Sequence, residues 1–181
     1  MDTRAADQCT AILAAASGDP ALQVNSGGHG PLSAEWMVPK ALWLKQNEPE
    51  VWAEAVYICE KQDYLNYHLT GCMVASSCNV AARWHFNAQA ALQSDAISTS
   101  RSRSSPPLST TGDKDWLTSP RGRPVSLLQQ LDLLDLLDKW PGRVVSLGEA
   151  IGGGLTAAAA GHLGLWEGML VAQGGPDAFV G

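Results

Sequence analysis

A stretch without periodic apolar residues divides the chain and limits what it can fold into. Between residues 88 and 122 the sequence is rich in Ser, Thr, Pro and Arg and has few spaced hydrophobic side chains. Such a composition buries too little apolar surface to offset the entropy lost on ordering, so we expect a disordered insertion. Its "SRSRSS" run is also compatible with a phosphorylated or RNA-linked tract. Residues 1–87 and 123–181 must therefore supply the core together.

The composition narrows the function classes. With 181 residues and 45% hydrophobic content, the chain can form one α/β domain or part of one. Its net charge of −6 argues against nucleic acid as a partner, because nucleic-acid affinity depends on clustered Lys and Arg. The four cysteines lack CxxC spacing, which favours a reducing compartment and argues against zinc.

Membrane and secretion signals are not recognisable in this sequence. No run reaches the roughly 18 to 20 apolar residues that a membrane-spanning helix needs. The opening "MDTRAADQ" also lacks the charged-then-apolar pattern of a secretory signal. We therefore expect an intracellular protein, cytoplasmic or plastid, that neither is secreted nor binds a membrane.

Local signals place several elements before the insertion. An Ala-rich pattern predicts a helix at 4–17, with Ile12 and Leu13 on its buried stripe and Gly18 as its C-cap. Pro39 should confine the regular part of a second helix to the residues from about Pro39 to Gln46. The further expectations are a helix at 49–54, a buried strand at 55–59, a helix ending at Gly71, core positions for Trp43, Trp52 and Tyr57, and an ambiguous segment at 73–84.

After the insertion the pattern becomes regular again. Leucines on one helical face predict one helix or two short ones between Val125 and Pro141. Thr156 is a candidate N-cap for an Ala-rich helix that extends to about Leu163. An apolar strand at 169–172 should then enter a glycine turn.

The glycine turn contains the strongest candidate for chemistry. In "QGGPD" (173–177), Asp177 would lie at the C-terminal end of a strand and at the start of a helix, where α/β folds bind ligands. The glycines allow a substrate to approach the backbone. From the pattern alone, a purely structural role for Asp177 as a helix cap is the stronger interpretation.

The remaining candidates are weaker. His29 lies in the loop "SGGHGP", which is more typical of a plain turn than of a ligand contact. His68 and His85 have no partner at metal-ligand spacing, so packing is favoured, and His162 fits the C-terminal turn of a helix. Asp63 precedes a helical pattern and is most simply a cap, with Tyr64 beside it as a candidate pocket wall.

Four segments, in consistent order, resemble the FGGY family of carbohydrate kinases. The run "PKALWLKQNEPEVWAEAVYICEKQDYLNYHLTG" (39–71) is similar to that family's proline-lysine helix, its EPE segment and its DYL…LTG helix. "MDTRA" resembles a D-x-R stretch, and "VASSCNVAARW" resembles a small-residue segment that ends in an aromatic. "VAQGGPDAFVG" resembles the strand and turn that carry the catalytic aspartate. Within the family, these segments most closely resemble the ribulokinase-like and xylulokinase-like branch.

The resemblance implies a fold and an activity. It implies part of a ribonuclease-H-like, actin-like ATPase lobe that binds sugar, in a parent enzyme that transfers the γ-phosphate of ATP, with Mg²⁺, to a ketopentose such as D-ribulose or D-xylulose. Asp177 would be the general base for the sugar hydroxyl. Asp2, Arg4 and Gly175 would line the sugar side. The partner is then a small-molecule sugar, and a homo-oligomer of the parent is left open.

Departures from the family pattern lead to a further expectation. This sequence has no counterpart of three family features: the D-x-G-T phosphate hairpin, a short sugar-contacting segment and the nucleotide lobe. Conversely, the insertion has no counterpart in the family. We therefore expect a fragment without a complete ATP or metal site and without kinase activity by itself. The alternative is a non-catalytic remnant, or a half-domain that binds a sugar or a protein partner.

Overall fold

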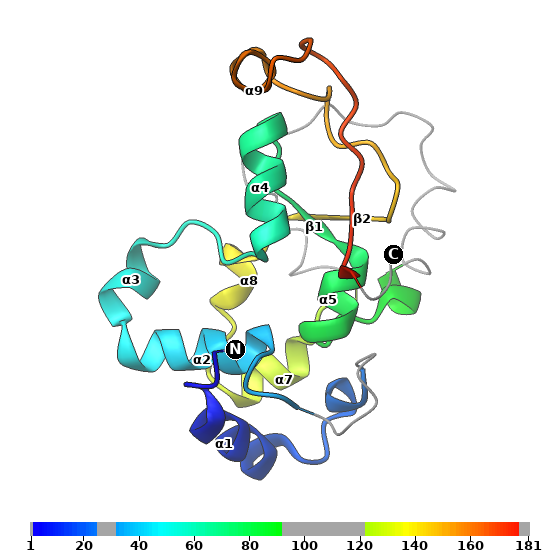
Figure 1. The fold of residues 1–181 in the computed structure, drawn as a ribbon. Coiled ribbons are helices and arrows are strands. Elements are labelled where there is room, and N and C mark those ends of the chain that lie inside the picture. Colours follow the sequence, from blue (N-terminus) through cyan, green and yellow to red (C-terminus); the bar gives the residue numbers. More distant parts are fainter. Residues whose placement is uncertain (1, 25–31, 92–121, 178–181) are drawn as a thin grey trace. The chain divides into compact units, whose positions relative to one another are not determined.

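The computed structural model describes residues 2–24, 32–91 and 122–177 and divides the chain into two compact units. The first unit comprises Met1–Val56 and Ala81–Lys139, and the second comprises Tyr57–Val80 and Trp140–Gly181. Each unit is thus built from two separate stretches of sequence, and each is described by itself. Together their described residues form a mixed α/β structure (Figure 1).

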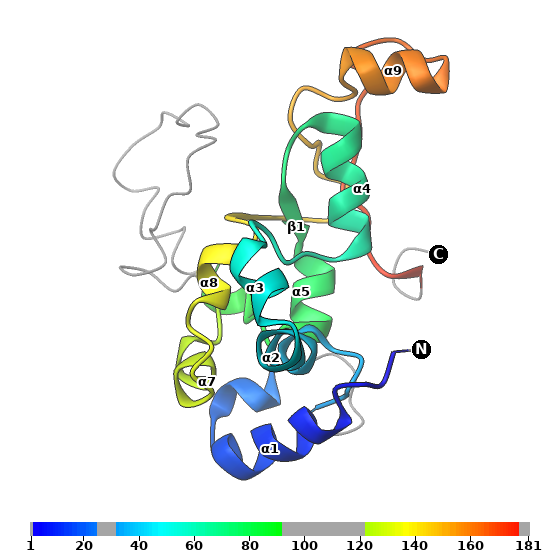
Figure 2. The same cartoon turned by 90° about the vertical axis from the view of Figure 1, so that its left-hand side faces the viewer.

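The first unit begins with two packed helices. Helix α1 (Ala6–Ala16) contacts α2 (Met37–Asn47) and α7 (Val125–Gln130), as Figure 2 shows at the blue end of the chain. Ile12 is fully buried, as expected, whereas Leu13 is 37% exposed. The expected cap at Gly18 is wrong, because the helix ends at Ala16 with Ser17 as its C-cap and Gly18 does not adopt a left-handed backbone.

Two prolines mark the starts of helices in this unit. Pro39 lies in the first turn of α2, where its missing N–H has no intrahelical acceptor, so the helix begins two residues earlier than expected. Pro49 is the first residue of α3 (Pro49–Glu54), whose bounds match the prediction. A short 3₁₀ helix, η1 (Pro20–Gln23), is capped by the Asp19 side chain, which accepts a hydrogen bond from the Ala21 N–H.

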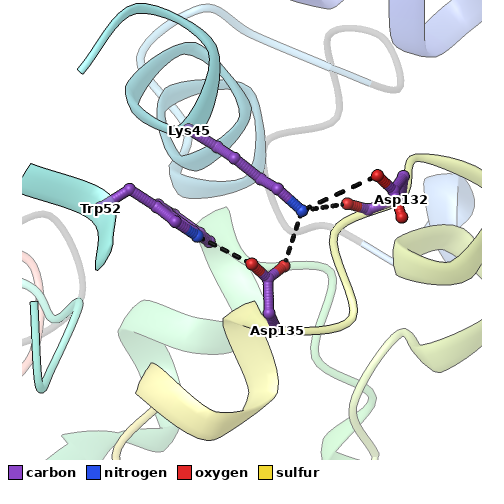
Figure 3. A network of polar contacts seen from close by, with 4 residues as sticks. All are labelled: Lys45, Trp52, Asp132 and Asp135. Atoms are coloured by element: carbon purple, nitrogen blue, oxygen red, sulfur yellow. Dashed lines mark hydrogen bonds and ion pairs between the residues drawn. The ribbon is translucent and has the colours of Figure 1, made fainter. Parts of the chain in front are cut away.

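A polar network connects α2 and α3 to the chain that follows the insertion (Figure 3). The Lys45 ammonium donates to Asp135 Oδ1 at 3.0 Å and to the Asp132 carbonyl. The indole N–H of Trp52, which is buried as expected, donates to Asp135 Oδ2 at 2.8 Å. Although burial alone would raise the pKa of Asp135, the hydrogen bonds from Trp52 and Lys45 outweigh it and lower that pKa.

The leucine-rich segment forms two short helices, α7 and α8 (Leu136–Lys139), which is one of the two expected outcomes. Asp132 adopts a left-handed backbone between them, with φ of 51°, and this interrupts what would otherwise be one helix. Four leucines of the segment are fully buried in this unit: Leu127, Leu128, Leu133 and Leu136.

The segment at 73–84, which was ambiguous in sequence, is a strand followed by a helix: β1 (Val74–Ser76) and α5 (Ser77–Arg83). After α5, His85 is buried, its ring lies edge-on to Trp36, and its Nδ1 lies 3.1 Å from the Ala21 carbonyl. Residues 88–91, assigned by sequence to the disordered insertion, are helical, and 92–121 lie outside the described residues.

The strand expected at 55–59 is wrong. Ala55 is the C-cap of α3, Glu60 is the N-cap of α4 (Lys61–Thr70), and the residues between them pair with no described strand. Val56 and Tyr57 are 71% and 45% exposed, so Tyr57 is not a core residue. Trp43 is only partly buried.

The second unit is organised around a pair of parallel strands. β1 pairs in register with β2 (Arg143–Val145), so that Val74 lies opposite Arg143 and Ser76 opposite Val145. β2 was not expected from the sequence. Val74, Val145 and Ile151 form the buried centre of this unit, and Cys72 and Val171 pack against them.

Helix α4 ends at Gly71, as predicted, in a left-handed cap with φ of 74°. Helix α9 (Ala157–Leu163) also has the predicted bounds, and its N-cap Thr156 accepts a 3.2 Å hydrogen bond from the Ala159 N–H. α4 contacts both β1 and α9 (Figures 1 and 2).

The strand expected at 169–172 is wrong as a regular strand. Only an isolated antiparallel bridge forms there, between Ala172 and Ala150. The opposite segment, 148–155, contains the left-handed residues Gly148, Gly152 and Gly154, which interrupt a regular ladder. Backbone hydrogen bonds still attach the segment, because the Ile151 N–H donates to the Val171 carbonyl and the Leu155 N–H donates to the Met169 carbonyl.

Candidate functional site

The candidate site of the second unit is the turn Gln173–Asp177, which follows the isolated bridge. The Gln173 N–H donates to the Glu149 carbonyl, and the Gln173 carbonyl accepts from the Gly148 N–H, both at 2.8 Å. These bonds hold the first residue of the turn to the neighbouring segment. These backbone hydrogen bonds therefore position the turn, although the residues before it do not form a regular strand.

Two polar side chains, Asn66 on α4 and Ser76 at the end of β1, also hold this turn. Asn66 is buried, and its Nδ2 donates to Gln173 Oε1 at 3.0 Å. The Ser76 hydroxyl, at the end of β1, donates to the Gly174 carbonyl at 2.8 Å. Asn66 and Ser76 thus fix two consecutive residues of the turn.

Asp63 lies at the centre of this arrangement. It is fully buried and accepts backbone hydrogen bonds from Ser76 at 3.1 Å and from Glu60 at 3.3 Å. The bond to Glu60 forms part of a capping box, so Asp63 does help to cap α4, but as the third residue of the helix and not as the residue that precedes it, which was the expectation. Burial raises the pKa of Asp63 to about 6, and hydrogen bonds from Ser76, Glu60 and Gln173 only partly oppose that shift.

Gly174 packs closely against a side chain of α4. A Cβ at this position would lie 2.6 Å from the side-chain nitrogen of Gln62 on α4. The other end of that amide is also engaged, because Gln62 Oε1 accepts from Asn79 Nδ2 at 3.1 Å. The missing side chain at Gly174 therefore lets the turn lie close to α4. The sequence pattern had suggested that the glycines would let a substrate lie close to the backbone.

The predicted base lies at the end of this turn. Asp177 is exposed and has a helical backbone, while Gly175 and Pro176 before it are partly buried. Residues 178–181 lie outside the described part of the chain. The structure thus places Gly175 and the exposed residue Asp177 in one turn.

Asp2 and Arg4 form a separate pair in the first unit. Arg4 Nε and Nη2 donate to the two carboxylate oxygens of Asp2 at 3.0 and 2.9 Å, and the Arg4 backbone N–H also donates to Asp2. The guanidinium lies 4.4 Å from the ring centre of Trp43. The Arg4 side-chain and backbone hydrogen bonds lower the pKa of Asp2 well below its ordinary range.

The other candidates have structural surroundings. His68 contacts the rings of Tyr64 and Tyr67 edge-on, and Tyr64 is 57% exposed. His162 lies exposed in the last turn of α9. His29 lies outside the described residues. Within the part of the chain that is described, no three His, Cys, Asp or Glu side chains are grouped to hold a metal ion.

The sequence reasoning missed Gln173, Asn66 and Ser76. One signal could have identified the second of these. Asp63, Asn66 and Thr70 recur at helical spacing on one face of α4, whereas Tyr64 and Leu65 beside them are exposed. A helix that buries its polar stripe needs polar partners elsewhere in the chain.

No family model matches the chain, but individual proteins do. An "FGGY carbohydrate kinase domain-containing protein" of Danio rerio is 32% identical over 186 residues, covering 100% of this chain and 28% of the relative. The chain is related to the FGGY carbohydrate kinases. A "Ribulokinase 1" of Staphylococcus saprophyticus is 38% identical over 64 residues, 35% of this chain and 12% of the relative. The resemblance to FGGY kinases seen in the sequence is therefore confirmed.

The fold agrees with that relationship. A solved structure described as a "xyloylose kinase" from Brucella ovis superposes with a TM-score of 0.62 at 22% identity, over 98% of this chain and 28% of that one. The chain thus has the fold of part of a sugar kinase. It spans roughly a quarter of the length of the curated FGGY relatives it matches. No helix in the described ranges is both long and apolar enough to cross a bilayer.

Proposed function

We propose that this chain forms part of an ATP-dependent carbohydrate kinase and that Asp177 is its general base. The observation that carries the proposal is the similarity to the zebrafish FGGY protein, which extends over the whole chain and so includes the Gln173–Asp177 turn. The turn supports it, because it is held from two sides and ends in an exposed carboxylate.

As a general base, Asp177 needs only to accept one proton. As a sugar hydroxyl attacks the γ-phosphorus of ATP, a new O–P bond forms, the bond to the ADP oxygen breaks, and the hydroxyl proton passes to the carboxylate. Mg²⁺ would supply neutralisation of the phosphate charge. The described residues offer no grouped ligands for that ion, so we assign it none and derive no step through it.

A ketopentose is the proposed acceptor. The support is the similarity to a relative named as a ribulokinase, which matches part of this chain at 38% identity. Asp2 and Arg4 are proposed as sugar contacts because both are substantially exposed and offer carboxylate acceptors and guanidinium donors to a polyhydroxylated ligand. Gly175 is proposed to let the sugar approach the backbone. We further propose that the fold belongs to the ribonuclease-H-like class.

The test is a chimera in which this chain replaces the matching segment of the zebrafish relative. ADP release would be measured with D-ribulose and with D-xylulose, alongside Asp177→Asn and the isolated 181-residue chain. We expect turnover in the chimera, a loss of about 100- to 10,000-fold in Asp177→Asn, and none for the isolated chain.

Two outcomes would contradict the proposal. An Asp177→Asn chimera that keeps most of its turnover would remove the role of that residue. A folded chimera that binds the pentose, seen by calorimetry, without releasing ADP would favour a non-catalytic sugar-binding protein. Circular dichroism of each chimera separates both outcomes from a failure to fold.

A further inference from the structure

The buried polar stripe of α4 is unusual because it faces the turn and not solvent. Asp63, Asn66 and Thr70 are at most 7% exposed, while Tyr64 and Leu65 on the same helix are each 57% exposed. Burying polar groups costs free energy unless they are hydrogen-bonded. The partners of Asp63 and Asn66 beyond their own helix are Ser76 and Gln173.

Gln173 is held at both ends of its side chain. Its Oε1 accepts from Asn66 and its amide nitrogen donates to the Gly174 carbonyl at 3.4 Å. The same side chain lowers the pKa of Asp63. The residue is only 2% exposed. Because its backbone N–H and carbonyl are also bonded, Gln173 has little freedom to move. Only Gly174, Gly175 and Pro176 separate it from Asp177.

We propose that Asp63 is a positioning residue that acts through Gln173 and Ser76 to set the direction in which the turn presents Asp177. The Ser76 backbone N–H donates to Asp63, and the Ser76 hydroxyl donates to the Gly174 carbonyl, so Ser76 connects Asp63 to the turn. Gln173 provides a second connection. This inference rests on the proposed role of Asp177 as the general base.

A change in the protonation state of Asp63 should change the conformation of the turn. The ionised carboxylate accepts hydrogen bonds from the backbone N–H groups of Glu60 and Ser76, one on each oxygen. A protonated carboxyl carries a donor on one of these two oxygens, so the contact at that oxygen weakens or rearranges. The pKa of about 6 places that rearrangement within the working range of most enzymes.

Few other ionisable groups surround Asp63 in the described residues. Cys59 and Glu60 precede α4, and the Glu60 charge adds to the raised pKa of Asp63. β1 contributes no ionisable side chain. Glu149, on the segment that bonds Gln173, forms an ion pair with Arg143, and His162 on α9 is exposed. A transition near pH 6 in the turn is therefore assigned to Asp63.

The experiment is an NMR titration of the 181-residue chain, following the amide signals of Gly174 and Gly175 from pH 4 to 8. We expect both to shift with a midpoint of about 6, and the carboxyl carbon of Asp63 to show the same midpoint. Asp63→Asn should abolish the transition. Gln173→Met should weaken it at the glycines while Asp63 still titrates, and Asp177→Asn should leave it unchanged.

The results separate this proposal from the kinase proposal. Glycine amides without a transition while Asp63 titrates in the wild-type chain would overturn the positioning role, whatever the chimera does. A transition of the expected kind together with an inactive chimera would leave the coupling intact and remove the kinase role. In an active chimera, Asp63→Asn should lower kcat more than it raises KM and should remove a pH step near 6 from the kcat profile.

Discussion

The indole Nε1 of Trp52 donates a 2.8 Å hydrogen bond to Asp135 Oδ2, although 83 residues separate the two in sequence. Lys45 binds the other carboxylate oxygen at 3.0 Å (Figure 3). Lys139, which donates to the Ala55 carbonyl, has its ammonium 5.6 Å from the centre of a Trp52 ring. These contacts connect the parts of the first unit that precede and follow the insertion.

The Lys45–Asp135 ion pair should be measurable by a double-mutant cycle with Lys45→Met and Asp135→Asn. We expect a coupling free energy of about 0.5 to 1 kcal/mol at pH 7, because both side chains are partly exposed. Urea unfolding gives the four stabilities. A cycle of Lys61→Met with Asp135→Asn is the control and should show no coupling. Equal coupling in both cycles would contradict a specific pair.

The same pair should respond to acid. The pKa of Asp135 is lowered in the folded chain, so its stabilising contribution is present above the unfolded pKa and is lost as pH falls through the folded value. We therefore expect the coupling free energy to shrink toward zero in strong acid, as far as the protein stays folded. Coupling that persists unchanged there would show that the contact is not ionic.

Asp63 should have the opposite pH dependence. Its pKa rises from 3.8 to about 6 on folding, so the folded state binds more protons between these values, and its contribution to unfolding free energy falls as pH rises across that interval. The change approaches about 3 kcal/mol. In urea titrations, the stability of Asp63→Asn relative to wild type should increase as pH rises from 4 to 7. A pH-independent difference would contradict the raised pKa.

Two adjacent glycines should differ sharply on substitution. At Gly154, where φ is 86°, a Cβ would lie 2.4 Å from the Met169 carbonyl oxygen, and neither backbone can yield cheaply. We expect Gly154→Ala to cost on the order of 3 kcal/mol. Gly153→Ala is the matched control, because nothing lies within 4 Å of its Cβ position, and it should change stability by less than about 0.5 kcal/mol. Similar losses for both variants in thermal unfolding would contradict this packing.

The cap of α9 offers a local test. Thr156→Ala removes the hydrogen bond to the Ala159 N–H and should cost about 1 kcal/mol, whereas Thr156→Ser keeps the hydroxyl and should cost much less. Hydrogen exchange at Ala159 and Ala160 reports the same loss locally. Equal exchange rates in the alanine and serine variants would show that the hydroxyl does not stabilise the helix.

What the sequence predicted well depends on contacts within a few residues. Pro49 starts α3, Thr156 caps α9 and Gly71 ends α4, and each acts on backbone groups of its own turn. The errors concern distant partners. The 55–59 stretch has strand-forming side chains but pairs with no strand among the described residues. β2 was missed because its pairing with Val74 depends on residues far away in sequence.

The candidate site follows the same rule. The glycine turn and the cap role of Asp63 were visible in sequence, because both depend on near neighbours. The bonds from Asn66 to Gln173 and from Ser76 to Gly174 join positions about a hundred residues apart and could not be read from spacing. The polar stripe on α4 signals that such partners exist, but it does not say which residues they are.

The interleaved composition of the two units bears on how the chain is made. A ribosome releases Val74 well before Arg143, so β1 emerges without the strand it needs and must wait for the later one. Until then its unsatisfied edge is open to wrong neighbours. Synthesis of this protein should therefore be most vulnerable to aggregation while its middle third is emerging, and chaperones that shield nascent chains should matter most in that interval.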